Sequence, residues 1–440
     1  LVLILIVLVA AAGIGTALIR RYMPSGEKMD GSEYFSLNDS SEAALVVNRE
    51  LKEEKAKIID GRYYIENTVV GEYINGRFYW DEKNQVMLYT LPTEMFQISP
   101  DTTEYQTSQG VQSTDYVILR REGDSCYLDL EFIQQYTDME YQTYDDPARL
   151  VIRTEWNEET MVTALKDSQI RQKGGIKSII VDEIAEGEQL YLLDQMDNWS
   201  QVATEDGYTG YIRNEDISEP EQVMFSHEST QPEYTSIQKD YKINLAWHQM
   251  TTADGNATLA EMVAGSQGIN TISPTWFSIA DNSGNITSLA SADYVNQAHS
   301  MGMEVWALID NFSTEVDTLA VLSDTQARAN IINQLMAQAD AVGLDGINVD
   351  FESITEEQGP HYVQFIREIS IACRNRGLVL SIDNPVPMPY STHYNRREQG
   401  IVADYVINMG YDEHHSGDTE AGSVASLGFV RQSIEDTLQE

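Results

Sequence analysis

The stretch from Asp345 to Glu352 reads Asp-Gly-Ile-Asn-Val-Asp-Phe-Glu, and it carries two acids, Asp350 and Glu352, two residues apart. Ile, Val and Phe favour a β-strand, in which alternate side chains point to opposite faces. Asn348 and the two acids therefore share one face, opposite an apolar one. Two carboxyl groups so close change each other's pKa, as in a site that transfers protons. A polar strand face is, however, also common on solvent-exposed antiparallel sheets.

The segments that follow indicate how this strand is covered. Residues 358–376 have helical periodicity, and a second strand is predicted at 378–382. A strand, a helix and a strand at this spacing favour a parallel sheet. Because parallel strands are usually covered on both faces, the polar row must point into a barrel lumen or a cleft.

Strand and helix signals alternate through residues 241–440, which predicts an α/β fold, the (β/α)8 TIM barrel. The sequence contains six such units, so we expect a barrel that is truncated at its C-terminal end. Active sites of this fold lie at the carboxyl ends of the strands, and Glu352 has that position on the fourth strand. The predicted strands cover residues 242–247, 271–277, 304–309, 346–352, 379–382 and 405–409.

Two motifs of this segment resemble those of family 18 glycoside hydrolases, the chitinases and related N-acetylglucosaminidases. The family pattern Asp-x-x-Asp-x-Asp-x-Glu is matched at Asp345, Asp350 and Glu352, and it departs at Asn348, where the family usually has Asp. A second pattern, Met-x-Tyr-Asp after the sixth strand, is matched by residues 409–412. The order of modules is similar to that of the peptidoglycan-acting, spore-associated branch.

The resemblance implies a retaining, substrate-assisted glycosidase that cleaves β-1,4 bonds next to N-acetylglucosamine in peptidoglycan or chitin-like glycans. It implies that Glu352 protonates the leaving oxygen, that Asp350 holds the acetamido N–H, and that Tyr411 bonds the acetamido oxygen. We expect Asn348 to donate a hydrogen bond to Asp350, and we expect no metal or cofactor. The candidate catalytic residues are thus Glu352, Asp350, Tyr411, Asn348 and Asp345, and the candidate substrate-binding residues are Asp412, Met409, Trp276, Asn311 and Asn384.

Two alternatives stay open at this point. Trp276 is placed either to stack on a sugar face or to fill the barrel core. The protein is either an enzyme or a non-catalytic cell-wall and carbohydrate-binding surface protein, and the presence of both Glu352 and Asp350 favours the enzyme. A complete barrel needs two more strands, so we expect activity to depend on strands beyond residue 440.

The N-terminal part predicts an anchor and a linker. Leu1–Ile19 is uncharged and almost entirely apolar, and a helix of this length matches the thickness of a membrane core. We therefore expect a transmembrane helix within residues 1–21, followed by a linker at 22–44. The protein would then be membrane-anchored and extracytoplasmic, at the cell surface.

Two small modules are predicted before the barrel. Residues 45–155 contain a weak internal repeat of strand, short helix and hairpin, which resembles the copper amine oxidase N-terminal-like α+β domain without implying copper chemistry. An unrelated α+β module is the alternative. Residues 160–217 resemble a bacterial SH3-like barrel with Trp199 as a regular feature, and residues 218–240 form a second linker.

Composition limits the partners. The formal net charge of −42 argues against nucleic acid, because phosphate binding needs clustered Lys and Arg. The two cysteines give no disulfide framework and no zinc spacing. The expected partners are a polysaccharide that contains N-acetylglucosamine, cell-wall peptides at the SH3-like domain, and the membrane through residues 1–19.

Overall fold

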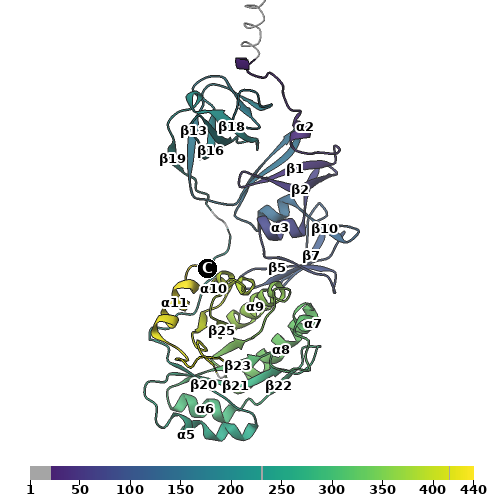
Figure 1. Ribbon diagram of the computed structural model, residues 1–440. Helices are drawn as coiled ribbons and strands as arrows, with labels where there is room; N and C mark the ends of the chain where they lie inside the picture. Colours follow the sequence, from purple (N-terminus) through teal and green to yellow (C-terminus); the bar gives the residue numbers. More distant parts are fainter. Residues whose placement is uncertain (1–20, 229–230, 416) are drawn as a thin grey trace, which may run out of the picture. The chain divides into compact units, whose positions relative to one another are not determined.

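The computed structural model describes residues 21–228, 231–415 and 417–440 (Figure 1). The chain divides into two compact units. One unit combines Leu1–Gly76 with Ile118–Gln231, and the other combines Arg77–Val117 with Pro232–Glu440. Residues 77–117 thus belong with the C-terminal segment, so the segment predicted as one domain at 45–155 is divided between the two units.

The C-terminal segment is built on a sheet of six parallel strands in the order β20-β21-β23-β24-β25-β26, with the short β22 (Ile286–Ser288) pairing antiparallel with β21. This matches the six strands predicted. The strands are β20 (Leu245–His248), β21 (Thr271–Ile279), β23 (Glu304–Asp310), β24 (Gly346–Asp350), β25 (Val379–Pro385) and β26 (Tyr405–Met409).

Helices between these strands cover the outer face of the sheet. On β24 the apolar residues Ile347 and Val349, with Phe351 just after it, are fully buried, and Phe351 stacks on Phe365 of α9 with ring centroids 5.2 Å apart. The longest of these helices in the C-terminal segment, α8, starts after Asp324, which caps the backbone N–H of Gln326. The helices are α5 (Leu259–Val263), α6 (Ala292–Ser300), α7 (Thr318–Leu322), α8 (Thr325–Val342), α9 (Gly359–Arg374), α10 (Arg396–Val402) and α11 (Leu427–Thr437).

A second, antiparallel sheet belongs to the same unit, and it packs on these helices. Tyr79 on β4 has its hydroxyl 2.5 Å from Nδ1 of His361 on α9. The carboxylate of Asp81 accepts a 2.8 Å hydrogen bond from the backbone N–H of Thr325 at the start of α8. The strands are β4 (Phe78–Asp81), β5 (Val86–Thr90), β6 (Met95–Ile98), β7 (Glu104–Thr107) and β8 (Gly110–Ser113).

The other unit contains a seven-stranded sheet and a small barrel. The sheet has the order β11-β12-β1-β2-β3-β10-β9, and its strands are β1 (Glu42–Val47), β2 (Glu50–Ile59), β3 (Arg62–Glu66), β9 (Leu119–Glu122), β10 (Ser125–Asp129), β11 (Glu140–Asp145) and β12 (Ala148–Arg153). Short helices α3 (Asn67–Tyr73) and α4 (Leu130–Gln135) follow β3 and β10. Both copies of the weak repeat thus run strand, helix, hairpin, but their hairpins pair in different sheets.

The small barrel covers the region that resembles SH3-like domains. Its strands are β13 (Glu158–Thr163), β14 (Ser168–Arg171), β15 (Ile180–Ile184), β16 (Gln189–Gln195), β17 (Trp199–Ala203), β18 (Thr209–Arg213) and β19 (Glu221–Met224). The last of these lies in the segment expected to be a linker.

The segment at 22–44, predicted as a linker, forms backbone hydrogen bonds with the small barrel. The backbone N–H of Met29 donates to the carbonyl of Ile180 on β15 at 2.8 Å, and that of Ser25 donates to Ile176 at 2.7 Å. The short helix α2 (Gly31–Tyr34) follows, and Phe35 is fully buried against Tyr208. Backbone pairing and one buried ring therefore order a stretch whose composition suggested flexibility.

The fold prediction is corrected at its N-terminal helix. Within residues 21–228, 231–415 and 417–440, no helix is both long enough and apolar enough to cross a membrane. A transmembrane helix is thus not supported, and Leu1–Ile19, to which it was assigned, lies outside the described residues.

Candidate active site

Three aspartates meet at the carboxyl ends of neighbouring parallel strands. Asp310 ends β23 and lies opposite Asp350, which ends β24. Val349 pairs with Ile382, so Asp350 and Asp383 are opposite each other one step further along β24 and β25. Adjacent strands lie about 4.8 Å apart, which brings these carboxyl groups close together on the inner face of the sheet.

Asp350 carries a strongly perturbed carboxyl group. Burial raises its pKa to about 7, and the negative charges of Glu352 and Asp310 add to this effect. Its Oδ1 atom is buried and has no hydrogen-bond partner among the described residues. The carboxyl group is therefore more easily protonated than that of an ordinary aspartate, and its Oδ1 is available to a further donor.

Glu352 stands just beyond the end of β24 and is exposed. Partial burial raises its pKa, and the charges of Asp412 and Asp310 raise it further. The amide of Asn311 holds the Glu352 backbone from both sides: its Oδ1 accepts from the backbone N–H at 2.9 Å, and its Nδ2 donates to the carbonyl oxygen at 3.0 Å. The predicted site residue Asn311 thus fixes the position of Glu352.

The loop after β26 lies within electrostatic range of the acids. Burial raises the pKa of the Tyr411 hydroxyl to about 12, and the charges of Asp350, Asp383 and Glu352 contribute. Asp412 follows with a φ of 65°, and Met409 is the buried last residue of β26. The structure therefore brings the loop residues and the acids of β24 together, although they are separated by about 60 positions in the sequence.

Asn348 is fully buried, and it contacts a different acid from the one expected. Its Nδ2 donates to Oδ1 of Asp383 at 2.9 Å, and no hydrogen bond joins it to Asp350 within the described part of the chain. Its Oδ1 accepts from Nε1 of Trp247 and from Oγ of Ser273, both at 3.1 Å. The expected bond to Asp350 is therefore wrong, because residues two apart on a strand point the same way while the amide reaches across to the next strand.

The residue of β25 that lies at the site is Asp383, which is not among the predicted site residues, and not the predicted Asn384. Asp383 faces inward and is 1% exposed, and burial raises its pKa to about 8, helped by the charge of Asp350. Asn384 faces the helices, where it exchanges hydrogen bonds with Gln399 of α10. Alternation along β25, the rule that selected Asn348 and Asp350, would have selected Ser381 and Asp383.

Two other predicted residues lie away from the acids. Asp345 precedes β24, so roughly 16 Å of strand separates it from Asp350. Its Oδ2 is 2.7 Å from Nε2 of His299 and accepts from the backbone N–H of Val305 at 2.8 Å. Trp276 is 1% exposed and donates to Asn256. It therefore fills the core and cannot stack on a sugar.

An exposed tryptophan does occur at the site. Trp247 on β20 faces inward, is 38% exposed, and donates from Nε1 to Asn348. Its ring is therefore partly accessible to solvent beside Asn348, whereas the ring of Trp276 packs against Tyr294 of α6.

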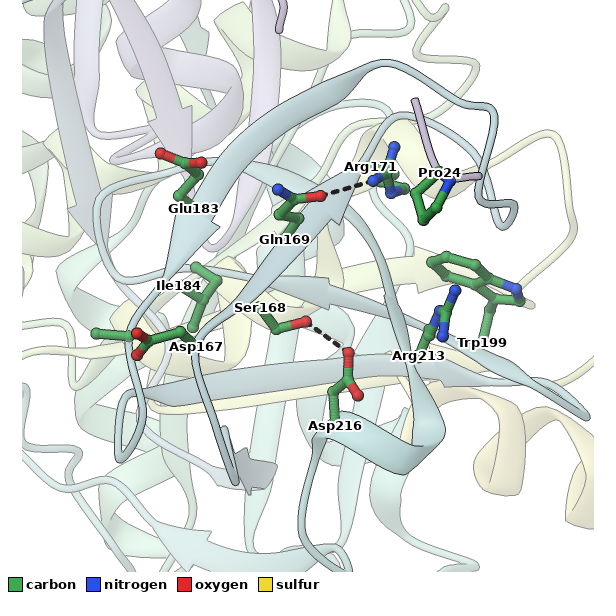
Figure 2. Close-up of a pocket in the computed structure, with 11 residues that line it drawn as sticks. Pro24, Asp167, Ser168, Gln169, Arg171, Glu183, Ile184, Trp199, Arg213 and Asp216 are labelled. Atoms are coloured by element: carbon green, nitrogen blue, oxygen red, sulfur yellow. Dashed lines mark hydrogen bonds between the residues drawn. The ribbon is translucent and has the colours of Figure 1, made fainter. Parts of the chain in front are cut away.

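A separate cavity of about 610 Å³ lies in the small barrel (Figure 2). Trp199 and Arg213 lie together on one side, and Pro24 of the N-terminal segment lies beside Arg171. Arg171 donates to Oε1 of Gln169 at 2.6 Å, and Ser168 donates to Asp216 at 2.6 Å. The cavity thus offers an aromatic ring and charges of both signs.

Two family models match the chain. The family model of glycosyl hydrolases family 18 matches residues 209–440, which is more than half of the chain. The chain belongs to glycosyl hydrolase family 18. A model described as bacterial dipeptidyl-peptidase Sh3 domain matches residues 170–217.

Individual relatives match shorter stretches. An uncharacterized glycosylase, YvbX, of Bacillus subtilis is 28% identical over 184 residues, which cover 39% of this chain and 53% of that protein. The cortical fragment-lytic enzyme of the same organism is 29% identical over 136 residues, 29% of this chain and 31% of that protein. The chain thus spans about a third to a half of the length of these relatives. The spore cortex-lytic enzyme SleL of Bacillus cereus is similar in structure, with a TM-score of 0.39 and 18% identity, covering 50% of each chain.

Proposed function

We propose that this protein is a glycoside hydrolase that cleaves β-1,4 bonds next to N-acetylglucosamine with retention of configuration. The observation that carries the proposal is the arrangement of Glu352 and Asp350. An exposed acid with a raised pKa stands at the carboxyl edge of the sheet, beside a partly buried acid whose Oδ1 atom is buried and has no partner among the described residues. Family membership supports the same reaction class.

The two acids leave the same face of one strand, so they cannot flank a sugar ring as an acid and a nucleophile must. Substrate assistance, the known exception of this family, fits this geometry. The protonated Glu352 gives its proton to the leaving glycosidic oxygen as the C1–O bond breaks. The acetamido oxygen of the substrate bonds to C1 from the other side and forms an oxazolinium ion.

Asp350 stabilises this intermediate by accepting a hydrogen bond from the acetamido N–H. Tyr411 donates to the acetamido oxygen, and Asp412 and Met409 line the subsite. Water then adds to C1 as the bond between C1 and the acetamido oxygen breaks, and it gives a proton to the Glu352 carboxylate, which restores the enzyme. The raised pKa of Glu352 serves the first step, because a glutamate with an ordinary pKa is ionised at neutral pH.

Peptidoglycan is the substrate that we favour over chitin, because the relatives include a cortical fragment-lytic enzyme. The test is release of reducing ends from purified peptidoglycan and, in parallel, from chitin oligomers. Glu352→Gln should abolish turnover and keep oligomer binding, whereas Glu356→Gln, which removes an exposed acid four residues away, should change neither. Binding without hydrolysis by the unaltered chain would instead support the non-catalytic carbohydrate-binding protein.

We also propose that the cavity of the small barrel binds cell-wall peptides. Arg213 can pair with a carboxylate group of a short peptide, while Trp199 offers an apolar face. Calorimetric titration with a peptidoglycan stem peptide tests this, with Trp199→Ala expected to remove binding and Leu193→Ala, an exposed position on β16, expected to retain it. Equal binding by both variants contradicts the assignment. Wall substrates of either kind place the protein outside the cytoplasm.

A further inference from the structure

Asp383 is buried beside Asp350, and the burial of a carboxyl group next to another acid needs a physical explanation. A carboxyl group that is 1% exposed is costly unless it is paired or neutral. Its Oδ1 accepts from Asn348, while its Oδ2 is buried with no hydrogen-bond partner in the described residues. The same holds for Oδ1 of Asp350 on the adjacent strand.

Asn348 determines which oxygen of the Asp383 carboxyl group can carry a proton. The Asn348 Oδ1 atom is held by Trp247 and Ser273, so its Nδ2 must point to Asp383. This bond occupies Oδ1 of Asp383 and leaves Oδ2 as the atom that can carry a proton. A proton on Oδ2 has a natural acceptor in the neighbouring carboxylate.

We propose that Asp383 is a positioning residue that keeps its proton at neutral pH and donates it in a hydrogen bond to the ionised Asp350. The inference rests on the proposed function, since it concerns how Asp350 is held toward the acetamido group. With Asp383 neutral, the pair carries one negative charge, and that charge sits on Asp350, where the oxazolinium ion forms. No proton is gained or lost by the pair during the reaction.

The surroundings favour this distribution of the proton. Burial disfavours ionisation of Asp383, and the negative charges of Asp350 and Glu352 add to this effect, while the hydrogen bond from Asn348 opposes it. From the other elements, the hydroxyl groups of Tyr362 on α9 and Tyr411 after β26 lie within electrostatic range of both aspartates. Asp310 lies on the far side of Asp350 and already accepts from Oγ of Ser278 at 2.6 Å.

Titration of the full chain tests the pair without any substrate. Aspartate labelled with ¹³C at the side-chain carboxyl is followed by NMR from pH 4 to 10, and the Asp383 signal is assigned by its loss in Asp383→Asn. We expect its midpoint above pH 7, a fall of about one pH unit or more in Asp350→Asn, and little change in Asp310→Asn, the matched removal of a carboxylate. A midpoint below pH 5 in the unaltered chain overturns the proposal.

Steady-state kinetics then test whether Asp383 positions Asp350. Asp383→Ala removes the donor and should lower kcat on the glycan by about tenfold or more, as expected for loss of a hydrogen bond to a charged group. Asp383→Asn keeps a donor at the Oδ2 position and should restore most of that loss. Equal losses in both variants would contradict the donor role, because Asp383→Asn keeps both the size of the side chain and a donor at that position. Absence of hydrolysis by the unaltered chain would refute the proposed function, and the titration would still decide the protonation of Asp383.

Discussion

Replacing Arg328 by Met should show how strongly the stability of the β4–β8 sheet and of helices α8 and α9 depends on one buried cation. Arg328 is fully buried on α8, and its Nη2 and Nε lie 2.9 and 3.1 Å from Oε1 of Glu368 on α9. Its Nη1 donates to the carbonyl of Leu322 at 2.6 Å and to the hydroxyl of Tyr79 on β4 at 3.3 Å. One guanidinium group therefore links two helices and a strand.

The expected loss of stability follows from the Glu368 carboxylate, which remains buried after the substitution. Glu368 is 7% exposed, and Gln364 at 3.0 Å is the other side chain that donates to it among the described residues. Leaving one member of a buried ion pair uncompensated costs about 3 to 5 kcal/mol. We expect Arg328→Met to lower the free energy of unfolding by that amount, measured by urea denaturation with tryptophan fluorescence.

Two further variants make this measurement decisive. Arg328→Met combined with Glu368→Leu removes the uncompensated charge and should recover much of the loss. Arg376→Met breaks an ion pair with Asp340 that is largely exposed, with Nε and Oδ2 3.4 Å apart, and should cost no more than about 1 kcal/mol. If Arg328→Met cost as little as Arg376→Met, the argument that the buried pair holds these elements together would fail.

Three other predictions concern the site. Asn311→Ala removes both hydrogen bonds to the Glu352 backbone and should lower kcat about 100-fold with little effect on KM, because a small displacement of the acid is enough; steady-state kinetics check this, and an unchanged kcat would contradict it. Trp247→Ala should weaken oligomer binding by up to about tenfold, whereas Trp247→Phe keeps a ring and should bind more tightly than the Ala variant; calorimetry compares the two, and equal affinities would exclude the ring as a contact. Asp383 has a pKa of about 8 in the folded chain against an ordinary 3.8, so the folded state holds a proton that the unfolded state has released, and its contribution to stability is lost as pH rises from about 4 to 8. At 1.36 kcal/mol per pH unit this amounts to at most roughly 6 kcal/mol, so Asp383→Asn should gain stability relative to the unaltered chain over that range, and parallel pH–stability curves would refute the assignment.

Alternation along one strand was sufficient to predict part of the site. Asn348 and Asp350 do share the inner face of β24, and Glu352 does stand at its end. The Met-x-Tyr-Asp motif places Tyr411 near these acids, because both segments follow carboxyl ends of strands in one parallel sheet. These inferences needed only local periodicity and the rule that such ends meet at one edge.

The same rule selects wrong residues where the strand face on which a side chain lies is not considered. Asn384 was chosen by its position near the end of β25, although the inner face belongs to Asp383. Trp276 is not at the end of its strand, which continues to Ile279, and its ring points into the helix layer against Tyr294, with centroids 5.1 Å apart. Asp345 matches the family motif but lies before the strand begins.

The sequence by itself determined the elements, the spacing of Asp350 and Glu352, and the motifs of family 18, because these depend on residues near one another in the chain. Only the tertiary structure decided that Asn348 bonds Asp383, which is 35 positions away, and that Asp383 lies opposite Asp350. It also decided that Arg77–Val117 packs with the C-terminal segment. Such contacts depend on the register between strands and on which surfaces bury each other, and neither is specified by a local pattern. The charge on Asp350, on which the proposed chemistry depends, is therefore set by a neighbour that the Asp345–Glu352 stretch does not contain.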